Sequence, residues 1–369
     1  MKIGIITYHR SQNYGALLQA YALQTFIESL GHDVFLVDYQ PAYGEDMYKL
    51  FSWNKFRCMS WANRISYLAK IAGTFVRVKC RQNNTRRYIE QNLHISDNTK
   101  FDLVIYGSDQ IWRKQHHLGY PDEFNPVYFG EGFVETQNKI SYAASMGKID
   151  VKDENDFHFI ESHLRKFNAL SVREEDLQQF ILSSFGLQCK LVLDPVLLLS
   201  KEQWKSHIEP KYLPSHKFIF YYNLQRLPQT DIITEEIVKQ TGLPVVEFRG
   251  YIPFFHYGHR YRFTADAQEF LTLLSGAEYV VTSSFHGLAL SLRFGKEFYM
   301  AMEQSRSSRA KTLLKHAGLE DRMIEKGNER QINTNNHINY EDVGKQLSFL
   351  ETDSRDWLVR QIEIINGNI

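Results

Sequence analysis

The first forty residues constrain the fold more than any other part of the chain. An apolar, β-branched run at Lys2–Thr7 predicts a strand, helical apolar spacing predicts a helix over Tyr14–Leu30, and His32–Asp38 predicts a second strand. Two strands joined by a helix run parallel, with a right-handed crossover. The chain therefore begins as an α/β fold. Its first strand–helix loop, Tyr8–Gly15, lacks the GxGxxG spacing, so we predict no dinucleotide site there.

The same alternation continues in two blocks that meet near Pro195. Further strands are predicted at Phe101–Tyr106, Ile140–Ala144, Leu170–Arg173, Leu191–Asp194, Phe218–Tyr222, Pro244–Phe248, Tyr279–Thr282 and Lys296–Ala301. Helices are predicted at Thr230–Thr241, Ala265–Ser275, Thr312–Ala317 and Tyr340–Ile365. A chain of 369 residues is longer than one hydrophobic core usually organises. We predict two Rossmann-like domains, 1–195 and 196–335, facing a cleft, with a final helix in 336–369 packing back on the first domain.

Between these strands, residues 45–95 form a basic and aromatic segment. Five basic residues lie close together in it: Arg77, Lys79, Arg81, Arg86 and Arg87. One interpretation is a solvated helical insertion. The other is a surface that approaches an anionic membrane or a lipid-diphosphate acceptor, since basic amphipathic helices bind such surfaces.

Composition excludes several classes of function. Lys plus Arg and Asp plus Glu are both 43, and binding to nucleic-acid phosphates needs a positive excess. Cys58, Cys80 and Cys189 show neither a zinc spacing nor a disulfide framework. The start does not resemble an export signal, and no apolar stretch has the length of a membrane span. We expect a cytoplasmic protein without a metal or a bound cofactor.

His286 occupies a junction between a predicted strand and a predicted helix. Ser283 and Ser284 follow the strand as candidate N-caps, and Gly295 is a candidate helix stop. In open α/β sheets ligands bind at the carboxyl ends of the strands, where free amides and the helix dipole attract anions. His286 is therefore either a reactive group at an anion site or a packing residue in the first helical turn.

Six segments together resemble the polysaccharide pyruvyl transferase family, over nearly the whole chain. They are Asn13–Leu23 (NYGALLQAYAL), Gly107–Trp112 (GSDQIW), Ser141–Ser145 (SYAAS), Ser171–Glu174 (SVRE), Val192–Pro195 (VLDP) and Thr282–Gly287 (TSSFHG). The resemblance implies the architecture of two-domain, GT-B-like glycosyltransferases. It also implies transfer of the enolpyruvyl part of phosphoenolpyruvate to two hydroxyls of one sugar, which gives a cyclic pyruvate ketal on a cell-surface polysaccharide precursor.

The resemblance also implies donor-binding residues. Phosphoenolpyruvate carries a carboxylate and a phosphate, and guanidinium groups match both anions. Arg173 and His286 occupy the family's arginine and histidine positions, and Arg309 falls near a basic position. Ser283, Ser284 and Arg306 complete the expected donor site. Close relatives often have arginine where this chain has Ser284, so Arg293, Arg306 or Arg309 would have to replace that charge.

His286 is the expected acid that protonates C3 of the donor, and Asp109 the expected base for the acceptor hydroxyl. Structural alternatives stay open at this point: Asp109 as a helix cap, Arg173 in a salt bridge with Glu174 or Glu175, and Asn13 as a turn residue. The expected acceptor or cleft residues are Asn13, Tyr14, Gly15 and Gln110.

Two other functions compete with this hypothesis. A nucleotide-sugar glycosyltransferase would have the same fold and release a nucleotide diphosphate. A catalytically silent glycan-binding protein would bind sugar without turnover, an interpretation that Ser284 motivates. The expected partners are phosphoenolpyruvate and a sugar acceptor, with a lipid-linked oligosaccharide and contact with the inner face of the membrane as open alternatives, and no nucleic acid.

Overall fold

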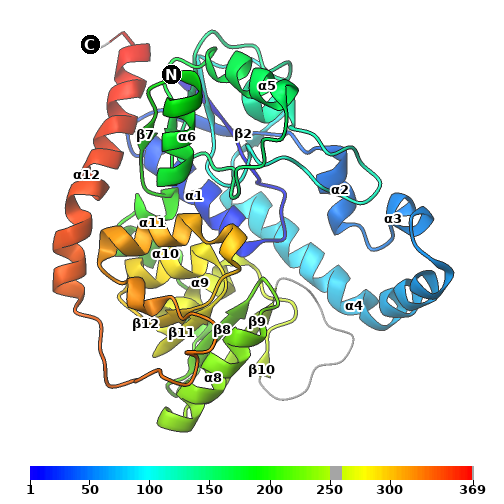
Figure 1. The fold of residues 1–369 in the computed structure, drawn as a ribbon, viewed down its shortest axis with the longest axis vertical. Coiled ribbons are helices and arrows are strands. Elements are labelled where there is room, and N and C mark those ends of the chain that lie inside the picture. Colours follow the sequence, from blue (N-terminus) through cyan, green and yellow to red (C-terminus); the bar gives the residue numbers. More distant parts are fainter. Residues whose placement is uncertain (250–259, 368–369) are drawn as a thin grey trace.

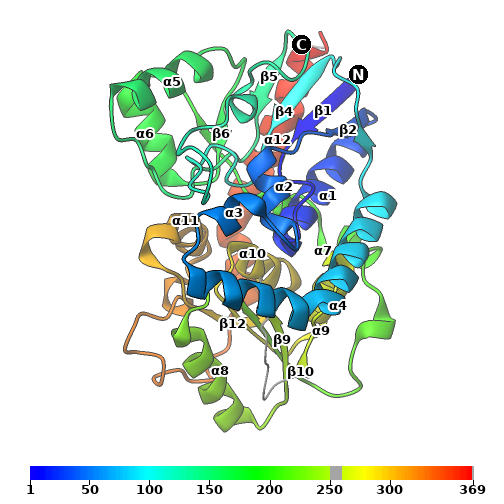
Figure 2. The ribbon, with the colours of Figure 1, turned by 90° about the vertical axis from the view of Figure 1, so that its right-hand side faces the viewer.

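The computed structural model describes residues 1–249 and 260–367, which form two halves that each contain a parallel sheet (Figures 1 and 2). In the first half the strand order is β3-β2-β1-β4-β5. The strands are β1 (Lys2–Ile6), β2 (Asp33–Val37), β3 (Ile95–Ser96), β4 (Leu103–Tyr106) and β5 (Lys139–Ser141). All of their pairings are parallel, as the strand–helix–strand pattern predicts.

The second half repeats this order. Its described strands follow one another as β10-β9-β8-β11-β12. They are β8 (Ile219–Asn223), β9 (Val245–Arg249), β10 (Arg260–Tyr261), β11 (Tyr279–Thr282) and β12 (Glu297–Met300). In both sheets the strand order therefore reverses direction beside the first strand, β1 or β8. Open α/β sheets bind ligands at this point of reversal.

The helices connect these strands. In the first half they are α1 (Tyr14–Glu28), α5 (Glu154–Leu164) and α6 (Glu175–Phe185), followed by α7 (Lys201–Lys205) in the connection to the second half. In the second half they are α8 (Pro228–Thr241), α9 (Ala267–Gly276), α10 (Phe285–Phe294) and α11 (Ser308–Ala317). The largest apolar cluster includes Leu17 and Leu18 of α1 together with Phe270 of α9 and Leu288 of α10. The two halves therefore share one continuous core.

Three predictions of local structure need correction. The strands predicted at Leu170–Arg173 and Leu191–Asp194 are short, β6 (Ser171–Val172) and β7 (Lys190–Leu191), and pair with each other. Single bridges join the neighbouring segments: Ile140 of β5 pairs with Ala169 just before β6, and Val172 of β6 pairs with Ala144 just after β5. The helix predicted at Thr312–Ala317 begins earlier, at Ser308. Our prediction from the sequence did not include α5 and α6, which cover the β5–β7 region.

The basic segment consists of three helices: α2 (Ala42–Tyr48), α3 (Trp53–Arg57) and α4 (Trp61–Asn92). Helix α4 crosses the molecule between the two halves (Figure 2). Arg81 of α4 donates to the carbonyl of Gln12 in the first half (3.3 Å) and to that of Arg249 in the second half (3.2 Å). This helix therefore bridges the two sheets.

Helix α12 (Tyr340–Ile365) follows the second half in sequence but runs alongside both halves (Figure 1). Its Ser354 hydroxyl accepts from the amide of Leu193 (2.9 Å), and Asp353 pairs with Lys190 (2.7 Å). At its other end it packs on α11. The exact domain boundaries stay a prediction.

Candidate functional site

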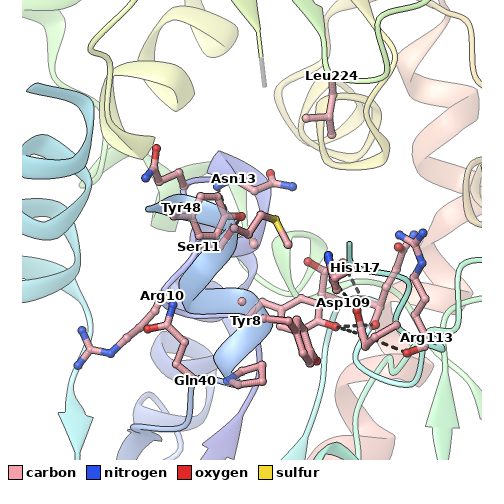
Figure 3. A pocket seen from close by; sticks show the side chains of 18 of the residues that line it. Tyr8, Arg10, Ser11, Asn13, Gln40, Tyr48, Asp109, Arg113, His117 and Leu224 are labelled. Carbon is pink, nitrogen blue, oxygen red and sulfur yellow. Dashed lines mark hydrogen bonds between the residues drawn. The ribbon is translucent and has the colours of Figure 1, made fainter. Parts of the chain in front are cut away.

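A cavity of about 670 Å³ lies between the two halves (Figure 3). Its wall includes the segments that follow the carboxyl ends of β1, β2, β4, β8, β11 and β12, together with one face of α4. These are the strand ends at which a doubly wound sheet presents free amides and side chains to a ligand. The cavity is large enough for a ligand of drug size.

Positive charge dominates the cavity wall. Among the described lining residues, the basic ones are Arg10, Lys49, Lys70, Arg81, Arg113, Arg306 and Arg309, and Asp109 is the one acidic residue. Arg10, Lys49 and Arg306 pair with nearby acids: Asp38, Glu45 and Glu303. Within the described part of the chain, Lys70, Arg81 and Arg113 have no ion pair with a carboxylate, so the wall has an excess of positive charge. Such a site favours a ligand with several negative charges.

Arg173 lies directly behind this wall. Its guanidinium donates to Asp109 Oδ1 (3.0 Å), to Ser108 Oγ (3.0 Å) and to Asp194. Burial acts to lower the pKa of Arg173, but the charges of Asp194 and Asp109 raise it above its usual range. The predicted salt bridge with Glu174 or Glu175 is wrong for both. Glu174 accepts from the Ser145 hydroxyl and the Gly147 amide, and Glu175 pairs with Lys315 and His316. Because Arg173 does not line the described cavity, it is placed to hold Asp109 rather than to contact a donor directly.

Asp109 occupies a tight turn after β4. Its φ of 73° lies in the left-handed region, and Oδ1 accepts from the amide of Gln110 (2.8 Å). No helix begins at this turn in the described structure, so the predicted helix-cap alternative is wrong. Burial alone would raise the pKa of Asp109, but the charges of Arg173, His286 and Arg309 lower it. Asp109 is therefore ionised near neutral pH and is a weak base.

His286 lies on the cavity wall in the first turn of α10, as predicted. Ser284 caps this helix by accepting from the amide of Gly287 (3.4 Å), and Gly295 ends it with a φ of 66°. The imidazole Nε2 lies 3.5 Å from Asp194 Oδ2 and has no closer hydrogen-bond partner within the described residues. Burial acts to raise the pKa of Asp194, but Arg173 and His286 lower it, so this carboxylate is charged and faces the imidazole.

The start of α1 packs against the imidazole of His286 on its Nδ1 side. A Cβ atom at Gly15 would lie 2.3 Å from His286 Nδ1. Glycine at this position therefore allows the N-termini of α1 and α10, one from each half, to approach closely. Gly15 itself does not line the described cavity, so it supports His286 instead of contacting an acceptor.

Tyr14 also differs from its predicted acceptor role. It is buried, stacks on Phe270 at a ring distance of 4.7 Å and contacts Phe248 and Tyr222. This places Tyr14 in the packing between the halves. Asn13 does line the cavity, and it also caps α1 by accepting from the amide of Gly15 (3.0 Å). Asn13 therefore has the predicted turn role and is also a half-buried residue of the cavity wall.

Arg309 and Arg306 reach the cavity from the segment after β12. Arg309 and Arg173 lie over the same ring, that of Phe285, at 5.3 Å and 4.8 Å. Burial and the neighbouring charge of Arg173 lower the pKa of Arg309 to about 10, which still leaves it charged at neutral pH. An anion between these groups would relieve the repulsion between the two guanidiniums.

Ser283, Ser284 and Gln110 complete the predicted residues on the wall. The Ser283 hydroxyl accepts from the amide of Gln225 (3.0 Å). Arg293, which we considered as a replacement for the family's arginine, donates to Leu197 O and Glu351 and does not line the described cavity. Of the three arginines considered for that charge, Arg306 and Arg309 line the described cavity together with Ser284.

Several cavity residues were missed by the sequence analysis. They are chiefly Arg10, Arg81, Arg113, Tyr8, Tyr48 and His117 (Figure 3 labels five of these and omits Arg81). Arg113 directly follows the Gly107–Trp112 segment, and Arg10 lies in the polar loop after the first strand, so both had a local signal. Arg81 was noted only as one of the basic residues of the 45–95 segment, because its place on the wall depends on where α4 crosses the two halves.

Among the described residues there is no group of His, Cys, Asp and Glu arranged to hold a metal ion. Nor does any helix of that part of the chain combine the length and apolar character that crossing a bilayer requires.

A family model for polysaccharide pyruvyl transferases matches residues 13–303. The chain belongs to this family. The match includes the cavity segments from Asn13 to Met302, and membership implies a transferase that acts on a sugar or polysaccharide acceptor. A sequence comparison with curated proteins gives no match.

One solved structure supports the fold of this pyruvyl transferase family member. The S. aureus protein MnaA, solved with UDP, shares 11% identity, covers 100% of this chain and 97% of its own, and has a TM-score of 0.53. UDP-GlcNAc 2-epimerase from Neisseria meningitidis also matches, with 10% identity, coverage of 98% of this chain and 99% of its own, and a TM-score of 0.47. The glycosyltransferase SnogD from Streptomyces nogalater matches with 10% identity, coverage of 98% of this chain and 99% of its own, and a TM-score of 0.40. The chain has a GT-B-like fold of two Rossmann-like halves that face a cavity.

Proposed function

We propose that the protein transfers the pyruvyl group of phosphoenolpyruvate to two hydroxyls of one sugar and so forms a cyclic ketal. The observation that carries this proposal is the composition of the cavity wall: Arg113, Arg306 and Arg309 lie on the same wall as the His286 imidazole, with Asp109 as the one acidic residue among those described. The carboxylate and phosphate of phosphoenolpyruvate supply the opposite charge.

The proposed reaction starts with a proton from His286 to C3 of the donor, which makes C2 electrophilic. A sugar hydroxyl attacks C2, the bond between C2 and the phosphate oxygen breaks, and the second hydroxyl closes the ring on C2. One hydroxyl proton replaces the proton consumed at C3, and the other leaves with inorganic phosphate. Asp194, 3.5 Å from Nε2, is positioned to stabilise the protonated imidazole before this transfer.

Asp109 accepts the hydrogen bond of the attacking hydroxyl in this proposal. Its lowered pKa makes it a weak base, but a hydroxyl that is adding to an electron-deficient C2 becomes strongly acidic. A weak, fixed carboxylate is then a sufficient acceptor. Arg173 holds this carboxylate through a 3.0 Å hydrogen bond, which makes Arg173 a positioning residue.

A nucleotide-sugar glycosyltransferase is the second candidate function. The cavity of about 670 Å³ exceeds what phosphoenolpyruvate alone needs, and MnaA was solved with UDP. The remaining space is equally explained by the sugar acceptor. We favour the pyruvyl transferase because of the family membership.

The experiment is to incubate the full chain with phosphoenolpyruvate and a panel of soluble and lipid-linked glycans, measuring inorganic phosphate and glycan mass together. The proposal expects equal amounts of phosphate and of a glycan heavier by one pyruvate ketal, and loss of both in His286→Gln. Nucleotide diphosphate release from a nucleotide sugar would support the second candidate instead. Glycan binding without turnover of either donor would support the catalytically silent alternative.

A further inference from the structure

We propose that the outer face of α4, together with α3, docks on the surface of an anionic lipid membrane. The first observation is an exposed apolar stripe along α4, formed by Trp61, Ile65, Leu68, Phe75 and Val76. These residues recur with helical spacing, so they project from one side of the helix. Trp61 is 77% exposed, Ile65 66% and Val76 70%, which is unusual for a group of large apolar side chains on one surface.

The opposite side of α4 faces the cavity. Tyr67, Lys70, Ile71, Thr74, Val78 and Arg81 line the cavity. In the helical projection Lys70, Thr74 and Arg81 lie across the helix from the stripe, whereas Ile71 and Val78 lie between the two sides. The packing of α4 on the protein therefore does not explain why its outer side is apolar. Trp53 of α3, just before α4 in the chain, is 67% exposed and extends the apolar surface.

The second observation is the charge around the stripe. Between Asp46 and Glu90 there is no acidic residue, and the basic residues are Lys49, Lys55, Arg57, Arg64, Lys70, Arg77, Lys79, Arg81, Arg86 and Arg87. Since the whole chain has a formal net charge of zero, the remainder is acidic. Arg57 and Lys79 are exposed near the two ends of the stripe.

These two observations favour a lipid surface over a second copy of the chain. Two copies that met through α4 would bring two groups of like charges together, which opposes association. An anionic bilayer attracts the basic residues, and tryptophan and aliphatic side chains insert at the level of the lipid headgroups. The amphipathic helix would lie in the plane of the membrane surface.

Docking in this orientation would have a geometric consequence for the cavity. Lys70 lies on the cavity wall and is itself exposed, so the cavity reaches the surface beside α4. The membrane would then lie next to the cavity opening. The docking does not depend on the proposed chemistry, and its test uses no substrate.

The test is cosedimentation of the full chain with vesicles of phosphatidylcholine alone or mixed with phosphatidylglycerol, at low and high salt. We expect binding to the anionic vesicles, weakened by salt. The variant Trp61→Ser/Ile65→Ser should have an affinity for anionic vesicles at least about tenfold lower than the wild type. In Arg57→Gln/Lys79→Gln, the loss of each basic residue should lower that affinity about fivefold. Neither pair lines the described cavity, so the melting temperature should stay unchanged.

The matched control is Phe349→Ser/Ile364→Ser, which removes an exposed aromatic residue and an exposed isoleucine from α12. This control should bind vesicles as the wild type does. Absence of binding to anionic vesicles, or equal loss in the control and stripe variants, would overturn the proposal. So would light scattering that shows a wild-type dimer which the Trp61→Ser/Ile65→Ser change converts to a monomer.

Discussion

Gly15→Ala tests whether the close approach of the two halves fixes the position of the His286 imidazole. The added Cβ would lie 2.3, 2.4 and 2.6 Å from the Nδ1, Cγ and Cβ atoms of His286, so the imidazole or a helix has to move. Overpacking of this kind costs about 1–3 kcal/mol. It opposes the gain of up to about 1 kcal/mol that alanine brings to a helix. A displacement of about 1 Å at a catalytic group lowers turnover about 100-fold.

The decisive measurement is a cycle with His286→Gly, which removes the Cβ atom of residue 286 as well as the imidazole. Without that side chain there is room for the new methyl group, so Gly15→Ala should change from destabilising to neutral or stabilising in that background. Thermal midpoints of the four proteins give the coupling, and turnover of the single Gly15→Ala variant gives the functional effect. Gly344→Ala in α12 is the control, because no other heavy atom lies within 4 Å of its added Cβ.

The control variant should be slightly more stable than the wild type, as alanine is a better helix former. If Gly15→Ala costs the same stability with and without the imidazole, the steric argument is wrong. If Gly15→Ala leaves turnover at the wild-type level, the position of His286 does not limit catalysis.

Three further predictions concern the charged groups. His286→Gln should lower turnover about 100-fold while donor affinity falls less, and normal turnover in a well-folded variant would make His286 a packing residue. Arg309→Gln should weaken phosphoenolpyruvate binding by about 1.5–3 kcal/mol, and unchanged calorimetric affinity would remove Arg309 from the donor site. Because the pKa of Asp194 is lowered in the folded protein, its stabilisation is present above the unfolded pKa and is lost as pH falls below about 4. Asp194→Asn should therefore be less stable at pH 7 and show a shallower loss in acid by chemical denaturation, whereas a parallel pH profile would contradict this origin.

The regular parts of the fold could be predicted because their signals are local. The helix at Tyr340–Ile365 has the predicted bounds, and the strand, serine cap and glycine stop around His286 are all present. Helix α4 was not predicted as one element. Apolar residues occur on both its faces, Ile71 and Val78 toward the cavity and Ile65 and Val76 toward solvent, so no single amphipathic period is visible.

The roles of the site residues depend on contacts that sequence does not contain. Arg173 was expected to bind the donor because arginine at a strand end suits an anion. In the structure Asp109 and Asp194, which follow other strands, occupy its guanidinium. Tyr14 was expected in the cleft but packs on Phe270, 256 positions further along the chain in the other half. Only the tertiary arrangement separates these buried residues from Arg309 and Asn13, which do reach the cavity.

The path of α12 also bears on how the protein is made. The amide of Leu193 and the hydroxyl of Ser354, which bond to each other, are 161 residues apart in sequence. At typical translation speeds the ribosome needs roughly 10–30 s to add that many residues. During this interval the first half of a nascent chain has its strands but not the helix that completes its surface. A stall in translation before residues 340–365 would therefore leave uncovered the apolar face on which Leu347, Leu350, Leu358 and Ile362 of α12 pack.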